Sequence, residues 1–188
     1  MWAKVKASQV IEIFASPRTI TFDNIKHPKE IFSQWSSSEL KAIGIYSLIQ
    51  GSVADARFET ATTVDYKVDD SKGTVTETIN KKDKDLDDLK ESYTAQIQKQ
   101  ASILLTPTDW MVVRKAEDSS KSIPSAVKTY RASVRTEADK IVKAISDCDT
   151  LDKLKALFVT EYNEDKSVKT KATMNTLPDD EDIKGYKR

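Results

Sequence analysis

The sequence has few of the residues from which most catalytic centres are built. It contains one histidine, His27, and one cysteine, Cys148, in 188 residues. A catalytic nucleophile–base pair would have to join these two. Structural roles are favoured instead: His27 precedes a proline at a helix start, and Cys148 lies in an apolar-periodic run typical of a buried thiol. Two such residues cannot supply a metal-binding cluster, and a single cysteine forms no internal disulfide.

Glycine, charge of one sign and long apolar runs are lacking as well. The four glycines are scattered, so we expect no glycine-rich phosphate loop. Thirty basic residues balance thirty acidic ones, which disfavours nucleic-acid binding because a phosphate backbone attracts a basic excess. No apolar run is long enough to span a bilayer, and "MWAKVKASQV" lacks the apolar core of a secretory signal. We therefore expect cytoplasmic synthesis and neither membrane nor nucleic acid as a partner.

Acidic residues are abundant but do not form a recognisable site. The run "DKDLDD" at residues 83–88 is similar to a calcium loop only in its alternating acids, because the central glycine and the terminal glutamate are missing. Acids at the start of a helix interact favourably with its dipole, so a solvated first helical turn is the better interpretation. We expect no catalytic residue, no metal and no cofactor, and hence a protein that is not an enzyme.

The apolar periodicity predicts an α+β chain with strands first and helices later. Only 38% of residues are apolar and 32% are charged, which favours an elongated or modular molecule over a single compact globule. The predicted parts are a small β-rich N-terminal domain with short helices and a hairpin at 1–80, a long connecting helix at 81–105, a helical C-terminal hairpin or bundle at 106–162, and a charged tail at 163–188.

Local signals in the N-terminal part are specific. "AKVK" and "VIEIF" predict two strands joined by a tight turn at residues 7–9, "TITF" a third strand and "IYSLI" another. Pro28 suits the first position of a short helix. Ser36 and Glu39 have the spacing of a capping box, flanked by Trp35 and Leu40 as a hydrophobic staple, and a glycine follows as a left-handed stop. Alternating residues then predict a β-hairpin over 54–80.

The long helix has a narrow apolar stripe on an otherwise polar surface. Such a stripe suits packing along one partner, including another copy of the chain. Pro107 ends this helix. The stripe consists of Leu86, Leu89, Tyr93, Ile97, Ala101 and Leu104.

Three shorter segments complete the helical part. A helix over 109–118 has Thr108 as its predicted cap, and Pro124 opens a helix that continues to about Asp147. Asp149 or Thr150 caps a fourth helix. The segment after residue 163 has almost no apolar residues, so we expect it to become ordered only against a partner.

Aromatic and basic residues gather around the proline break. Trp110 follows it directly and is placed to cover the end of the long helix, while Arg131 and Arg135 share one helix face. One interpretation is a structural hinge held by packing and by ion pairs to acids such as Asp109 or Glu117. The other is a docking surface, because Trp, Tyr and Arg are enriched at binding hot spots. The candidate interaction residues are Trp110, Arg114, Tyr130, Arg131, Arg135, Leu86, Leu89, Tyr93 and Ile97.

The stretch "LLTPTDWMVVRKAEDSSKSIPSAVKTYRASVR" at 104–135 resembles the short C-terminal module of bacteriophage tail assembly chaperone-like proteins. In that module a long helix leads through "LL-x-x-TDW" to a proline-started helix with "YR-x-x-[LV]R". A tryptophan usual ahead of the Tyr-Arg pair is absent from "SAVKTYR". "MWAKVKASQVIEI" and "HPKEIFSQWSSSELKAIGIY" are similar to the opening of small phage tail-fibre-associated proteins. The matching residues of the first motif are Leu104, Leu105, Thr108, Asp109, Trp110, Pro124, Tyr130, Arg131, Val134 and Arg135.

The resemblance implies a noncatalytic tail-associated structural or adaptor protein of the tail, baseplate or tail-fibre attachment. Its implied partners are other phage tail or tail-fibre proteins and further copies of itself. It would be found in the host cytoplasm during assembly and in the virion tail if retained. The alternative is a transient tail or tail-fibre assembly chaperone that leaves the particle. A third hypothesis, a glycan-binding module, would need Trp2, Phe14, Phe22 or Tyr66 to be exposed.

Overall fold

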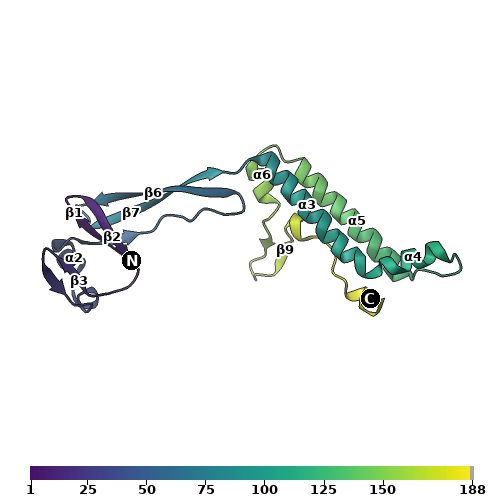
Figure 1. The fold of residues 1–188 in the computed structure, drawn as a ribbon, viewed down its shortest axis with the longest axis horizontal. Coiled ribbons are helices and arrows are strands. Elements are labelled where there is room, and N and C mark those ends of the chain that lie inside the picture. The colour runs from purple at the N-terminus through teal and green to yellow at the C-terminus, as the bar shows by residue number, and fades with distance from the viewer. Residues whose placement is uncertain (187–188) are drawn as a thin grey trace. The chain divides into compact units, whose positions relative to one another are not determined.

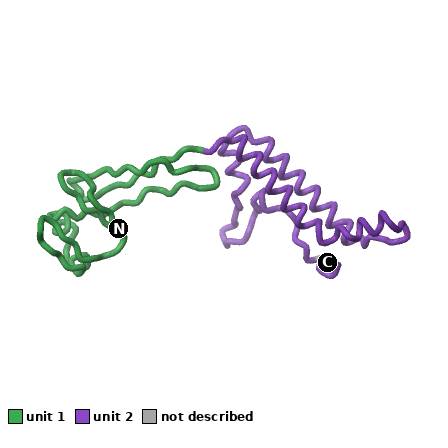
Figure 2. Tube along the Cα trace, viewed as in Figure 1, with its two compact units in different colours: residues 1–83 green, residues 84–188 purple. Residues whose placement is uncertain are grey.

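The computed structural model describes residues 1–186 of the chain (Figure 1). It divides into two compact units, Met1–Asp83 and Lys84–Arg188 (Figure 2). The first unit contains most of the strands and the second all of the long helices, so the chain is a mixed α+β protein with strands first, as predicted.

Unit 1 is built on a five-stranded sheet with the order β2-β1-β5-β7-β6. β5 and β7 pair in parallel, and the other neighbours pair antiparallel. β2 also approaches β6, so the two outer strands curl toward each other. The strands are β1 (Trp2–Lys6), β2 (Gln9–Phe14), β5 (Ile45–Ile49), β6 (Glu59–Asp69) and β7 (Thr74–Asp83).

Tight turns set the hairpins of unit 1. Ala7 and Ser8, between β1 and β2, have φ angles of 50° and 57°, the left-handed pair that a two-residue hairpin turn requires. A second hairpin of β3 (Ile20–Phe22) and β4 (Ile25–His27) follows. The predicted strands and the turn at residues 7–9 are therefore confirmed.

Two short helices, α1 (Ile31–Gln34) and α2 (Ser37–Ala42), lead back into the sheet. α1 begins three residues after Pro28, so the predicted place of this proline in the first helical turn is wrong. Gly44 ends α2 with a φ of +73°, and an added Cβ would lie 2.6 Å from both the Phe22 ring and the Val5 carbonyl oxygen. Glycine is thus required there by conformation and by space.

The capping box at the start of α2 is confirmed. The Ser36 hydroxyl accepts from the Glu39 N–H at 3.3 Å, and the Glu39 carboxylate accepts from the Ser36 N–H at 2.7 Å. These bonds to Ser36 lower the pKa of Glu39.

Replacing Ser36 with alanine is expected to lower the free energy of unfolding of unit 1 by about 1 kcal/mol, because it leaves an N–H at the helix start without its acceptor. Urea denaturation measures the change. Ser38→Ala, in the same turn but outside the cap, is the matched control and should change it by less than about 0.5 kcal/mol. Equal effects of the two substitutions would contradict the capping role.

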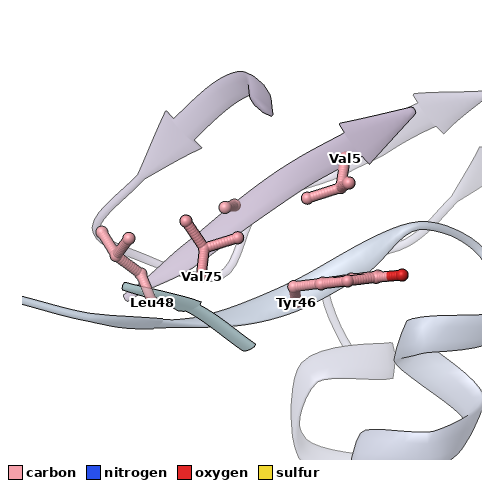
Figure 3. Close-up of a cluster of buried hydrophobic side chains, with 5 residues drawn as sticks. Val5, Tyr46, Leu48 and Val75 are labelled. Carbon is pink, nitrogen blue, oxygen red and sulfur yellow. The ribbon is translucent and has the colours of Figure 1, made fainter. Parts of the chain in front are cut away.

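The core of unit 1 consists of two apolar clusters. Alternate residues of the strands point inward and form the first cluster: Ala3, Val5, Tyr46, Leu48 and Val75 (Figure 3). The second cluster joins the sheet to the short helices and contains Phe14, Ile20, Ile31, Leu40 and Ile45. Trp35 packs against this second cluster, of which Leu40 is a member, which is consistent with the predicted hydrophobic staple.

Unit 2 is organised around two helices that lie side by side (Figure 1). They run antiparallel, because Lys90 near the start of α3 donates to the carbonyl of Cys148 just after α5, while Arg131 of α5 reaches Leu105 at the end of α3. The elements are α3 (Leu86–Leu105), the 3₁₀ turn η1 (Thr106–Thr108), α4 (Asp109–Glu117), α5 (Ser125–Ser146) and α6 (Leu151–Ala156). Thr150, one of the two predicted caps, is the cap of α6.

The predicted helix start at residue 81 is wrong. β7 continues to Asp83, and α3 begins only after Asp85, whose carboxylate accepts from the N–H groups of Asp87 and Asp88. The acidic run is therefore the first turn of a helix, as predicted. The long helix belongs to the second compact unit and is not a separate connecting part. None of the helices within the described residues is long and apolar enough to cross a membrane.

The prediction that the segment after residue 163 orders only against a partner is wrong. It contains β9 (Val168–Thr170), which pairs with β8 (Glu161–Tyr162) just ahead of the segment, and then η2 (Thr173–Asn175) and η3 (Glu181–Tyr186), which pack on α5. Its few apolar residues suffice because they are well spaced: Ala172, Met174 and Ile183 are all buried.

Candidate interaction sites

The residues of the proline-break motif converge on one buried arginine. Arg131 of α5 donates from Nη1 to the Leu105 carbonyl oxygen and to the Thr108 hydroxyl, both at 2.8 Å. Its Nη2 donates to Asp109 at 2.7 Å, which forms an ion pair. The guanidinium thereby bonds to the end of α3, to η1 and to the start of α4. It fixes the turn between these elements.

Burial makes this junction sensitive to its partners. The Arg131 side chain is 8% exposed, whereas Asp109 is 53% exposed. Thr108 is fully buried, and its hydroxyl donates to the Leu105 carbonyl at 3.0 Å. Thr108 occupies the N-cap position of α4, as predicted, but its side chain makes no capping bond. The hydroxyl bonds instead to the Leu105 carbonyl and to Arg131.

A groove of about 500 Å³ lies beside this junction, between α3 and α5. Arg135, one turn after Arg131, is exposed and lines it together with Asp139 from the same helix. Gln98 and Ser102 line the side formed by α3. The two predicted arginines therefore share a face but differ in role: Arg131 is a structural clamp, and Arg135 is available at the surface.

Trp110 and Arg114 both lie on α4. They line a pocket of about 230 Å³ with Pro124 and with Tyr186 of the C-terminal segment. Trp110 is half-buried, so its indole is not fully covered. This ring faces a part of the chain that the sequence interpretation had left unstructured.

The apolar stripe of α3 is used within unit 2. Leu89 and Ile97 are buried, and Leu86 is half-buried. The Tyr93 ring meets the Phe158 ring edge-on, with centroids 4.9 Å apart. Tyr130, on α5, is buried as well. The interpretation of this stripe as a surface for a second copy is therefore wrong, because α5 and the segment after it already cover it.

The two residues considered for catalysis have structural surroundings. The His27 ring packs edge-on against Trp35, with centroids 5.7 Å apart. The Cys148 thiol donates to the Ala144 carbonyl at 3.2 Å, and burial raises the pKa of this thiol. Over residues 1–186, no group of three or more His, Cys, Asp or Glu side chains is placed to hold a metal ion.

The aromatic residues considered for glycan binding are mostly packed. Phe14 is buried, and Trp2 and Phe32 close around it with ring centroids 4.9 to 6.2 Å apart. Phe22 is half-buried and lies under the Lys4 ammonium. Of the four candidate side chains, only Tyr66 is exposed. The structure thus offers no aromatic platform on this unit.

A hydrogen-bonded network ties two loops of unit 1 to its core. The Asp70 carboxylate accepts from the Ser8 hydroxyl at 2.5 Å and from the Tyr46 hydroxyl at 2.7 Å. These bonds lower the pKa of Asp70, with the Ser8 bond as the largest cause. The same carboxylate raises the pKa of Tyr46.

The Asp70 network is expected to make unit 1 acid-sensitive. Because the pKa of Asp70 is lower in the folded chain, its stabilising contribution is present above about pH 4 and is lost as the pH falls through the folded value. We expect the urea midpoint to fall less steeply between about pH 5 and about pH 2 in Asp70→Asn than in the parent. Asp139→Asn, at an exposed carboxylate of unit 2, is the control. Equal slopes for the parent and Asp70→Asn would contradict this role.

One exposed surface was missed by the sequence interpretation. Every residue of β6 from Thr60 to Lys67 is exposed, although the strand is part of the sheet. Val64 and Tyr66 are 46% and 39% exposed. The alternation of these residues predicts a half-buried strand, whereas the strand is exposed from Thr60 to Lys67. The exposure arises because β5 is short and leaves much of β6 and β7 without a covering strand. The sequence of β6 alone does not show this.

Comparison with known proteins adds no relative: the chain matches no protein-family model, no curated protein and no solved structure.

Proposed function

We propose that this protein is a noncatalytic structural or adaptor component associated with a bacteriophage tail, at the tail, baseplate or tail-fibre attachment, and that it acts through protein–protein contacts. Its partners are other tail or tail-fibre proteins and further copies of itself. The proposal begins from the resemblance of residues 104–135 and of the N-terminal segments to proteins of that kind.

The observation that carries the proposal is the convergence of the motif. Leu105, Thr108, Asp109 and Arg131 lie up to 26 residues apart in sequence and are joined directly by hydrogen bonds. A resemblance to a family motif is less readily due to chance when the matching residues bond to one another in the fold than when they lie far apart. The packing of α3 on α5 also supports the proposal, because these are the long helix and the proline-started helix that the motif connects.

The surfaces of the two units support a role in binding proteins. Unit 1 presents a long exposed strand, β6, and unit 2 presents the groove beside Arg135. The two residue types most expected in acid–base or thiol chemistry, His27 and Cys148, each pack against their own neighbours. These features favour an adaptor over the alternative hypotheses of an enzyme or a glycan-binding module.

Quantitative mass spectrometry of purified phage particles tests the proposal. A resident component is expected at a fixed ratio to the major tail protein across independent preparations. Absence from particles combined with recovery alongside tail proteins from infected cells would indicate the transient assembly chaperone instead. Absence from both would contradict a tail-associated role.

A further inference from the structure

β6 is the outermost strand of the unit 1 sheet on its side. It pairs with β7 along its length, and among the described residues no strand is hydrogen-bonded to its other edge. β5 pairs with β7 only at Thr74–Thr76, so β6 and β7 continue beyond the other strands as a ribbon (Figure 1). An exposed strand edge presents unpaired N–H and C=O groups that can bind another strand.

The apolar face of the sheet continues onto this ribbon. Val68 lies opposite the fully buried Val75, and Val64 lies opposite Ile79. Tyr66 lies between the two valines on the same face, since side chains alternate along a strand. Beyond Val68 this face is largely uncovered: Val64 and Tyr66 keep 46% and 39% of their surface exposed. Asp65 and Lys67 project from the opposite face and are exposed.

The segment Val64-Asp65-Tyr66-Lys67-Val68 is complementary to itself when reversed. In an antiparallel pairing of two copies centred on Tyr66, each Val64 lies opposite Val68 of the other copy. Each Asp65 likewise lies opposite Lys67. Opposite residues of an antiparallel pair share a face, so apolar side chains meet on one face and opposite charges on the other.

Neighbouring registers lack this match. Centring the pairing on Asp65 would place two aspartates opposite each other, and centring it on Val64 would bring Glu59 opposite Asp69. The Tyr66-centred register also avoids the irregularity in β6 between Ala61 and Val64. The approach of β2 does not cover this part of β6, because Thr60–Lys67 stay exposed. Ser8, in the turn between β1 and β2, bonds to Asp70, which lies beyond the end of β6.

We propose that a second copy of this chain docks on the outer edge of β6, by antiparallel pairing of residues 64–68 across a two-fold axis at Tyr66. This inference rests on the proposed function in that it names one partner of an adaptor working through protein contacts. The pairing is short and buries less than a standard interface of about 1,600 Å², so the dimer is weak and depends on concentration.

Charge inversion tests the register. Sedimentation velocity of the purified full chain from micromolar to millimolar concentration measures the dimer dissociation constant. Asp65→Lys or Lys67→Asp alone would place like charges opposite each other twice, and each is expected to weaken dimerisation about tenfold or more. The double variant D65K/K67D restores opposite charges and should dimerise like the parent. An equimolar mixture of the two single variants should form the mixed dimer, although neither dimerises well alone.

Several results would overturn the proposal: a parent chain that stays monomeric at millimolar concentration, single variants that dimerise like the parent, or a double variant that fails to recover. Neutral D65N/K67Q addresses the opposite view, that these charges guard the edge against pairing. The proposal expects weaker association of this variant, and stronger association would refute it. Circular dichroism and urea midpoints establish that each variant is folded. Because these measurements use pure protein, their outcome is separate from that of the particle analysis.

Discussion

Replacing Arg131 with alanine is expected to lower the free energy of unfolding of unit 2 by about 3 kcal/mol or more. The substitution removes three charge-assisted hydrogen bonds, each of which contributes about 1.5 to 3 kcal/mol in a typical protein. It also leaves the buried Thr108 hydroxyl without its donor from α5. The bond to Asp109, whose side chain is 53% exposed, lies at the lower end of this range, so most of the loss comes from the bonds to Leu105 and Thr108. Urea denaturation followed by circular dichroism measures the change.

Two further variants separate the clamp from a general effect of charge. Arg135→Ala removes an exposed arginine one turn along the same helix and should change the free energy of unfolding by less than about 0.5 kcal/mol. Arg131→Lys keeps the charge, but a single ammonium cannot reproduce the forked geometry, so an intermediate loss is expected. A loss for Arg135→Ala as large as for Arg131→Ala would contradict the assignment of Arg131 as the clamp.

The second large effect is expected at Ile97. This side chain is 1% exposed in the stripe of α3, and truncation to alanine should lower the free energy of unfolding by about 2 to 5 kcal/mol through lost burial and the cavity left behind. Thermal and urea denaturation of the purified protein measure this loss. If the stripe were instead a surface for a second copy, Ile97→Ala would weaken association and leave the isolated chain nearly as stable.

Ile103 provides the matched control for Ile97. It is the same residue type on the same helix but is 60% exposed, so Ile103→Ala should cost less than about 0.5 kcal/mol. A similar loss at the two positions would contradict burial as the cause, since helix propensity favours alanine over isoleucine at both. Neither substitution should alter the β6 pairing measured by sedimentation.

The sequence predicted best those features that depend on neighbouring residues. The capping box of Ser36 and Glu39 needs only a spacing of three, and the left-handed stop at Gly44 needs only a residue without a side chain. The turn at residues 7–9 could be predicted because the alternation of apolar and polar residues, which indicates a strand, is interrupted there. The prediction that Pro28 lies in the first helical turn was wrong, because the backbone angle that proline prefers also suits the turn that precedes α1.

Features that depend on distant residues were predicted less well. Nothing near Thr108 in the sequence shows that a guanidinium 23 residues later will bind its hydroxyl, so a capping role was the natural inference. Ala172, Met174 and Ile183 are too few to mark a segment as ordered, yet each meets a site that α5 and its neighbours have already shaped. The arginines were found as candidates, but the distinction between buried Arg131 and exposed Arg135 required the fold.

The short connection between the two units has a consequence for how such a gene can change. Met1–Asp83 and Lys84–Arg188 are separate compact units, and only Lys84 and Asp85 separate the end of β7 from the start of α3. A genetic crossover at these codons would fall at the boundary between the two compact units. Descendants could therefore exchange one half for another by recombination while inheriting the remaining half unchanged.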